Sequence, residues 1–278
     1  MQFKAIATIL HRRDLTDSAL DIAIDAARRW GAHLHVMCVG VNQAEPGFYF
    51  AGAQVISLQE NLVHAHEDAM ALETAVRARL GVEDIAWDVQ TVTVLFNGLD
   101  ALLSDQMRFH DLVILPSPYR DGAERIDVGI FEACTFGADR PVLILPKHGA
   151  NLAISSVQIG WDDGREAMAA SLAALPLLQE ARQTEIVLID PPRHAADRSD
   201  PGGRLAQYLA RHGVKPEIFV AAKTPEGIAG QLLRRAHERD IDLIVMGAYG
   251  HSRLREAIAG GTTRDMLHIA DLPLLMAH

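Results

Sequence analysis

A glycine-rich segment near the end of the chain carries the residues best suited to binding chemistry. Four glycines and two threonines lie between an apolar run and a segment with helical periodicity: Gly247, Gly250, Gly260, Gly261, Thr262 and Thr263. Glycine lets a backbone approach an anion closely, and the N–H groups and dipole of a helix N-terminus favour negative charge. The threonine hydroxyls add donors. Each glycine alone could instead shape a turn or cap a helix, but together they predict an anion site.

The elements that must position this segment alternate between strand and helix. In the first half, we expect strands at 3–10, 33–39, 87–94, 111–116 and 141–146, and helices at 14–30, 58–80, 97–109 and after Val128. In the second half, we expect strands at 153–161, 184–190, 215–221, 242–247 and 273–278, and helices at 164–182, 203–212, 226–239 and after Gly260. Each half is therefore predicted to be an α/β, doubly wound, Rossmann-like or flavodoxin-like domain, with a parallel sheet of five strands and flanking helices.

The two halves repeat one another. Two pairs of segments match, at offsets of 131 and 132 residues: Asp111–Ile114 with Asp242–Val245, and Ala138–Leu143 with Ala270–Leu275. The repeat predicts tandem domains at 1–149 and 150–278. Doubly wound sheets bind ligands beyond the carboxyl ends of their strands, where the strand order reverses. The loops after the first and fourth strands of each half are therefore the expected sites.

The spacing G-x2-G-x9-G, between a predicted strand and a predicted helix, resembles the nucleotide-binding signature of the universal stress protein family. The flanking sequences DLIVMGAYGHSRLREAIAGG and PLLMAH are also similar to that family. The resemblance covers both halves in element order, but its specific motif lies only in the C-terminal segment. It implies a nucleotide-responsive stress protein that holds ATP, or ADP or AMP, with Mg²⁺ as a companion ion. The family signature ends in Gly-Ser or Gly-Thr, whereas Gly261 stands at the hydroxyl position here.

Acidic residues at strand ends supply further candidates. Family members commonly place an acid after the first strand, and Asp162 in the turn Gly160–Ala167 is the matching residue. Its carboxylate could accept hydrogen bonds from a ribose or adenine, or help hold Mg²⁺; alternatively, Asp162 or Asp163 caps the next helix. Asp190, which closes the second strand, is a candidate for the adenine end. Arg253, in the insert of the glycine-rich loop, is a candidate clamp for a triphosphate.

The N-terminal counterpart of the glycine-rich loop has lost these features. The repeat sets Pro116 against Gly247 and Tyr119 against Gly250, and retains Gly129 opposite Gly260. Proline has no N–H to donate, and tyrosine adds bulk where a close approach is needed. We therefore expect a degenerate site in the first half and one nucleotide per chain.

Composition limits the partners of the chain. Among 278 residues, 36 are Asp or Glu and 26 are Lys or Arg, a formal net charge of −10. Duplex nucleic acid requires a basic surface, so we do not expect a nucleic-acid partner. No stretch approaches the ~20 apolar residues of a membrane span, and no secretion signal is recognised, so we expect a cytoplasmic protein with no membrane partner.

Three functions remain open at this point. A binding protein is favoured, because no nucleophile, base and orienting residue occur together; we predict no catalytic residue and no metal site built by the protein alone. The alternatives are a slow ATP hydrolase and an interaction scaffold that no longer binds nucleotide. The closing strands 141–146 and 273–278 are expected at sheet edges and should pair, making the halves an intramolecular pseudo-dimer; a homodimer through other faces stays open.

Overall fold

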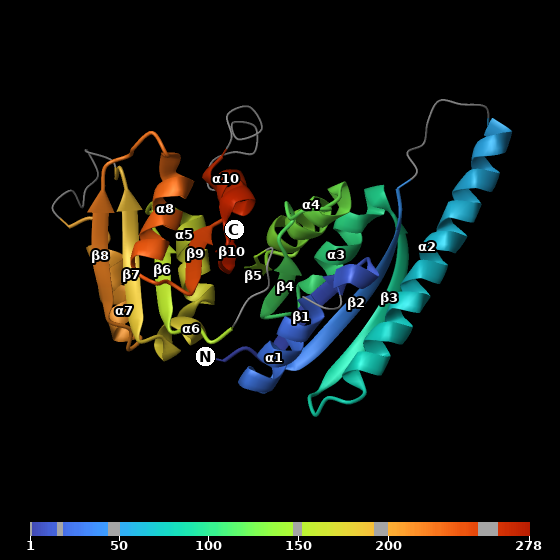
Figure 1. The fold of residues 1–278 in the computed structure, drawn as a ribbon, viewed down its shortest axis with the longest axis horizontal. Coiled ribbons are helices and arrows are strands. Elements are labelled where there is room, and N and C mark those ends of the chain that lie inside the picture. The colour runs from blue at the N-terminus through green and yellow to red at the C-terminus, as the bar shows by residue number, and fades with distance from the viewer. Residues whose placement is uncertain (1, 16–18, 44–50, 147–151, 192–199, 250–260) are drawn as a thin grey trace. The chain divides into compact units, whose positions relative to one another are not determined.

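The computed structural model describes residues 2–15, 19–43, 51–146, 152–191, 200–249 and 261–278. They form two compact units, Gln2–Arg140 and Pro141–His278 (Figure 1). In each unit, helices cover both faces of a largely parallel sheet, which confirms the predicted doubly wound α/β fold. Within the described residues, no helix combines the length and the apolar character needed to cross a bilayer.

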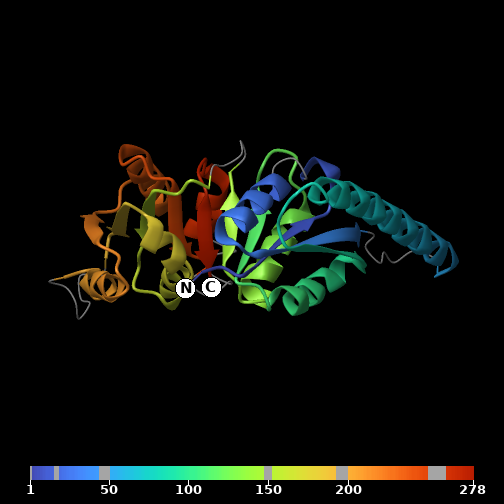
Figure 2. The ribbon, with the colours of Figure 1, turned by 90° about the horizontal axis from the view of Figure 1, so that it is seen from below.

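The N-terminal unit has a parallel sheet in the order β3-β2-β1-β4. Its strands are β1 (Ala5–Leu10), β2 (His33–Asn42), β3 (Trp87–Leu95) and β4 (Leu112–Pro116). Its helices are α1 (Asp21–Trp30), α2 (Ala51–Leu80), α3 (Leu99–Met107) and α4 (Arg125–Glu132), with short turns η1 (Arg13–Leu15), η3 (Phe96–Gly98) and η4 (Ala133–Gly137). The blue and cyan helices α1 and α2 cover one face, and the green α3 and α4 the other (Figure 2).

The C-terminal unit repeats this order as β8-β7-β6-β9-β10, with every neighbouring pair parallel. Its strands are β6 (Ser156–Gly160), β7 (Gln183–Ile189), β8 (Pro216–Ala221), β9 (Leu243–Gly247) and β10 (Leu274–Ala277). Its helices are α5 (Arg165–Ala173), α6 (Leu175–Glu180), α7 (Gly203–Arg211), α8 (Gly227–Glu238) and α10 (Thr262–Ile269). In both units the strand order reverses beside the first strand.

Strand β5 (Val142–Leu145) pairs antiparallel with β10, with Leu143 opposite Leu275. Both strands are buried along their whole length. The pairing gives each closing strand a hydrogen-bonded neighbour at an edge that would otherwise expose apolar backbone. It also places β5 with the C-terminal unit in space, although the sequence repeat counts this strand with the first half.

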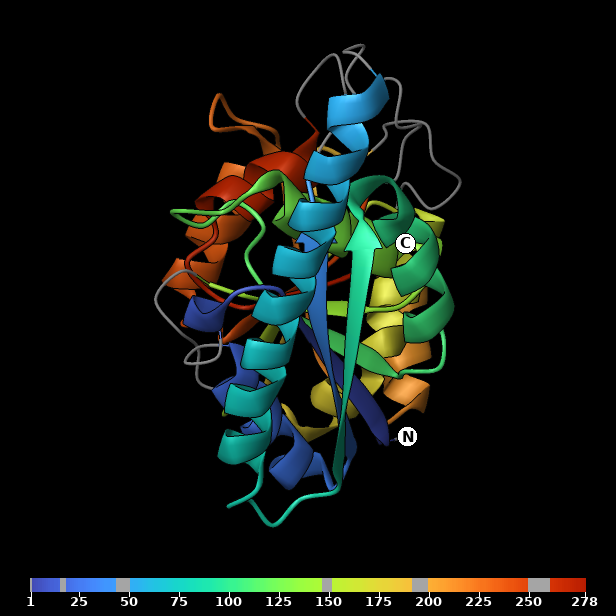
Figure 3. The ribbon, with the colours of Figure 1, turned by 90° about the vertical axis from the view of Figure 1, so that its right-hand side faces the viewer.

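Several helices differ from their expected extents. Helix α1 begins at Asp21 rather than at residue 14, and α4 begins at Arg125 rather than after Val128. Two further differences have local reasons. Helix α2 begins at Ala51 rather than at residue 58, because the preceding residues include good helix formers such as Ala53 and Gln54. It runs along β2 and β3 and continues past their ends (Figure 3). The single helix expected over 164–182 is divided into α5 and α6, since Pro176 near the start of α6 lacks the N–H that a continuous helix would use.

Matched aspartates fix the amino end of the first strand in each unit. The Oδ2 atom of Asp111 accepts the backbone N–H groups of residues 4 and 5 at 2.7 and 3.0 Å. The Oδ2 atom of Asp242 accepts those of residues 155 and 156, both at 2.8 Å. One carboxylate therefore ties β1 to β4, and the other ties β6 to β9. The same bond at the repeat-matched position is structural support for the tandem arrangement.

We expect Asp242→Ala to lower the free energy of unfolding by about 2–4 kcal/mol, because two backbone donors lose their acceptor. Urea denaturation measures this change. The control is Asp271→Ala, which removes only an exposed pair with His237 and should cost under about 1 kcal/mol. Equal losses in the two variants would contradict the structural role of Asp242.

Candidate nucleotide site in the C-terminal unit

The carboxyl ends of β6 and β9 lie side by side, since Gly160 pairs with Met246. Strands β7 and β8 continue the sheet on one side of this pair, and β10 continues it on the other. The chain leaves β6 toward α5 and leaves β9 toward α10. This is the reversal point at which doubly wound sheets form ligand sites.

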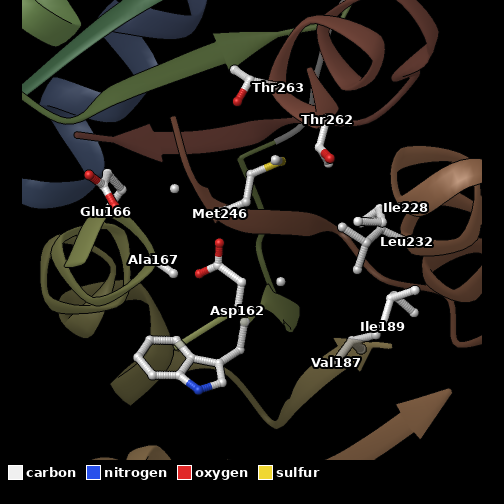
Figure 4. Close-up of a pocket in the computed structure, with 13 residues that line it drawn as sticks. Asp162, Glu166, Ala167, Val187, Ile189, Ile228, Leu232, Met246, Thr262 and Thr263 are labelled. Carbon is white, nitrogen blue, oxygen red and sulfur yellow. The ribbon is translucent and has the colours of Figure 1, made fainter. Parts of the chain in front are cut away.

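A pocket opens at this point, with polar groups on one side and an apolar wall on the other. The polar side chains that line it are Asp162, Glu166, Thr262 and Thr263. The apolar side chains that line it are Ala167, Val187, Ile189, Ile228, Leu232 and Met246, and the lining is completed by Gly160, Trp161 and Gly247. Figure 4 shows Asp162 and Met246 near the middle of the lining residues, with Ile189, Ile228 and Leu232 on the side opposite Glu166 and Ala167.

Asp162 is held by the turn that leads into α5. Its Oδ1 atom accepts the N–H of Gly164 at 2.9 Å, and the intervening Asp163 has a left-handed backbone with φ of 63°. Gly164 is the N-cap residue of α5 and makes no side-chain cap bond. Neither aspartate therefore caps α5 through its side chain, and Oδ2 of Asp162 has no hydrogen-bond partner among the described residues.

Strand β9 ends in a close approach to the first turn of α5. A Cβ atom on Gly247 would lie 2.6 Å from the backbone nitrogen of Ala167 and 2.9 Å from Cβ of Glu166. No side chain fits between these backbones, so glycine is required here by packing alone. The contact also places Glu166 at the start of the glycine-rich loop.

Helix α10 begins with Gly261 as its N-cap, in an extended conformation without a side-chain cap bond. The first backbone N–H groups of such a helix have no partner within the helix. Thr262 and Thr263 follow, and Oγ1 of Thr263 accepts the N–H of Tyr249 at 2.9 Å. Tyr249 has a left-handed φ of 55°, so the chain turns sharply after β9.

The structure brings several of the predicted residues together. Asp162, Gly247, Thr262 and Thr263 line the pocket, and Gly261 adjoins it as the cap of α10. Asp190 is exposed after β7, has φ of 52°, and is not among the described lining residues. Gly250, Arg253 and Gly260 lie outside the described residues.

Glu166 and the apolar wall of the pocket could not be recognised from the sequence. Acidic residues are common in the first turn of helices, because they interact favourably with the helix dipole. An acid at position 166 therefore does not by itself indicate a binding site. The wall comes from α8 and from the ends of β7 and β9, and its residues look like ordinary core positions. Only the three-dimensional arrangement shows that they border a pocket.

Glu166 is a buried, ionised carboxylate. Its side chain is 7% exposed, and Oε1 accepts the Nε–H of Arg165 at 2.7 Å. Burial alone would raise the pKa of Glu166, but the hydrogen bond and charge of Arg165, with a contribution from His278, hold this pKa below its ordinary value. Within the described residues, no group of three or more His, Cys, Asp or Glu side chains is placed to hold a metal ion.

The matching position in the N-terminal unit is closed. The space at the ends of β1 and β4 encloses about 10 Å³, against about 130 Å³ in the C-terminal pocket. Ile6 pairs with Leu112 as Val157 pairs with Leu243. His11 stands five residues after Ile6, as Asp162 stands five residues after Val157. A histidine therefore replaces the candidate ligand-binding carboxylate.

Asp127 of α4 fills this N-terminal position with an internal anion. Its Oδ1 atom bonds to Nε2 of His11 at 2.9 Å and to Nη2 of Arg120 at 2.8 Å. The side chains of His11 and Asp127 are only 3% and 4% exposed. Burial would raise the pKa of Asp127, but the bonds from His11 and from the backbone N–H of Glu124, with the charges of His11 and Arg120, lower it to about 2.

Residues 147–278 match the model of the universal stress protein family. A universal stress protein of Synechocystis sp. strain PCC 6803 is 33% identical over 73 residues, which are 26% of this chain and 24% of that protein. The C-terminal unit of the chain belongs to the universal stress protein family. The chain spans about a quarter of the length of this curated relative.

Solved structures of universal stress proteins share the fold over nearly the whole chain. A universal stress protein of Archaeoglobus fulgidus DSM 4304 has a TM-score of 0.67 at 14% identity and covers 98% of this chain and 95% of its own. A structure from Pseudomonas aeruginosa UCBPP-PA14, assigned to the same family, has a TM-score of 0.60 at 15% identity and covers 99% and 93%. At these identities the likeness shows a shared fold.

The charge network of Asp127 predicts a pH-dependent stability of the N-terminal unit. Because the pKa of Asp127 is about 2 in the folded chain and ~3.9 when unfolded, its contribution is present above about pH 4 and is lost as the pH falls toward 2. We expect Asp127→Asn to lower the free energy of unfolding at pH 7 by about 2 kcal/mol. The variant should also lose the decrease in stability that the wild type shows as the pH falls from about 4 toward 2. Urea denaturation at pH 2.5 to 7 measures both effects.

Asp105→Asn is the control for this series, because the carboxylate of Asp105 makes only exposed contacts, with Arg108 and with Gln106. If Asp127→Asn had the acid dependence of the wild type, the assigned role of the buried carboxylate would be wrong.

Proposed function

We propose that this universal stress protein binds one adenine nucleotide, in the pocket of its C-terminal domain, and acts as a nucleotide-responsive regulatory protein. The observation that carries the proposal is the combination, in one pocket at the reversal point, of an apolar wall with a hydroxyl-lined helix start. An amphipathic ligand with a flat apolar ring and a phosphate matches both sides. The choice of adenine rests on the family resemblance.

The apolar wall supplies the surface for the base. Val187 and Ile189 come from β7, and Ile228 and Leu232 come from α8, so two elements face the ring. Apolar pockets with a few well-placed polar groups are typical of small-molecule sites. Asp190 remains a proposed contact to the adenine edge, because it follows Ile189 directly.

The polar side supplies contacts for the sugar and phosphate. Asp162 accepts one backbone hydrogen bond through Oδ1, and Oδ2 lines the pocket as an acceptor for a ribose hydroxyl. The N-terminus of α10 with Thr262 and Thr263 offers donors to phosphate oxygens. Gly250, Gly260 and Arg253 stay sequence-based candidates for the same part of the ligand.

Mg²⁺ fits this site only as a companion of the phosphates. Asp162 and Glu166 are the carboxylates among the described lining residues, and a Mg²⁺ ion takes about six oxygen ligands. The ligand and water would therefore provide the rest of its coordination. A catalytic role has no comparable support, so we favour binding over hydrolysis.

Titration calorimetry with AMP or ATP in the presence of Mg²⁺ tests the proposal. We expect a stoichiometry near one, because the N-terminal counterpart is filled by Asp127. We expect Asp162→Asn to weaken binding by about 1–3 kcal/mol, since a ligand donor loses a charged acceptor while the turn to Gly164 keeps an oxygen.

The matched control is Asp163→Asn, at an exposed neighbour that does not line the described pocket. Asparagine also tolerates the left-handed backbone of that position. A stoichiometry near two would contradict the closed N-terminal site, and the same loss in both variants would contradict the role of Asp162. Failure of every adenine nucleotide to bind would contradict the proposed function.

A further inference from the structure

The described wall of the C-terminal pocket carries a net negative charge. Two carboxylates line it, Asp162 and Glu166, and neither Lys nor Arg is among the lining residues that the structure describes. The two acids differ in setting, because Asp162 is exposed while the side chain of Glu166 is almost fully buried. A buried charge is screened less by salt and water than an exposed one.

Glu166 lies beside the phosphate end of the pocket. The close packing at Gly247 puts its Cβ atom next to the first residue of the glycine-rich loop. Its charge is compensated by Arg165, which is 84% exposed, and by His278. Solvent weakens the contribution of an exposed partner. Among the described lining residues, the charges that a ligand phosphate meets are therefore those of carboxylates.

Within the described residues, the start of α10 also has no N-cap hydroxyl. Gly261 stands where the family signature has a hydroxyl residue, so α10 offers no N-cap side chain to a terminal phosphate. Each additional phosphate brings more negative charge toward Glu166, whereas the interactions of the base and ribose stay the same. The cost of extra phosphates is lower when a divalent cation accompanies them.

We propose that Glu166 is a specificity residue that makes the pocket select adenine ligands of low negative charge, a nucleoside monophosphate over the triphosphate, unless a divalent cation is bound with the ligand. The proposal rests on the nucleotide site proposed above and names the ligand class that this site prefers. Glu166 acts through its charge and location, without a covalent step.

Equilibrium binding of AMP and of ATP is measured with EDTA at low ionic strength, and again with Mg²⁺. For the wild type in EDTA, we expect AMP to bind about threefold to tenfold more tightly than ATP, since a charge at this range has an effect of that order. Mg²⁺ or added salt should reduce the difference. ATP binding as tight as AMP binding in EDTA would overturn the proposal.

Two variants change the charge in opposite directions. Glu166→Gln keeps the size of the side chain and should raise the affinity for ATP in EDTA about threefold or more, with a smaller change for AMP. Arg165→Gln, at an exposed position, removes the ion-pair partner of Glu166 and should increase the preference for AMP. Glu217→Gln on β8, paired with Arg239, is the control and should leave both affinities unchanged.

The outcomes distinguish failure of the proposed nucleotide site from failure of the proposed role of Glu166. If AMP and ATP both bind but neither variant at residues 165 and 166 changes their ratio, the nucleotide site stands and the role of Glu166 is wrong. If Glu166→Gln weakens both ligands equally, the residue is structural, which also overturns the proposal. If neither ligand binds the wild type under any condition, the nucleotide site and the inference built on it are both wrong.

Discussion

The pairing of β6 with β9 is the constraint on which the C-terminal site depends. Asp242 ties the amino ends of these strands together, so the register of the pair is fixed at the end opposite the pocket. At the other end, the absence of a side chain on Gly247 lets the first turn of α5 contact the end of β9. Asp162, Glu166 and the start of α10 are brought to one pocket because these strand ends are adjacent. A shift between the two strands would separate all three.

The two units share the arrangement of their first and fourth strands but differ in what lies at the carboxyl ends of these strands. Asp111 repeats the strand bond of Asp242, so both units present adjacent strand ends. In the C-terminal unit these ends leave space beside Asp162, whereas in the N-terminal unit His11 and Arg120 bind the buried carboxylate of Asp127. An internal anion thus occupies the place where the repeat would put a ligand anion. The N-terminal unit keeps the fold, and ion pairs within the unit occupy this position.

The fold could be predicted from the sequence because its signals are local or repeated: buried strands alternate with helices, and the aspartates at 111 and 242 recur with their flanking residues. Asp162 and the threonines were recognised because they stand at strand and helix ends. Glu166 was missed because its role depends on the contact with Gly247, which joins segments about 80 residues apart. The sequence of the N-terminal loop showed the loss of glycines but not that Asp127 fills the site. The partners of a buried charge come from distant segments and cannot be recognised in the sequence.

Hydrogen exchange measured by mass spectrometry, with and without saturating AMP, tests the central claim most directly, because it reports on both units in one experiment. The account predicts slower exchange at the turn 160–167 and at the start of α10, with no change at residues 11–13 or at the start of α4. Protection at the N-terminal segments, or equal protection in both units, would contradict the assignment of one open site and one closed site to this chain.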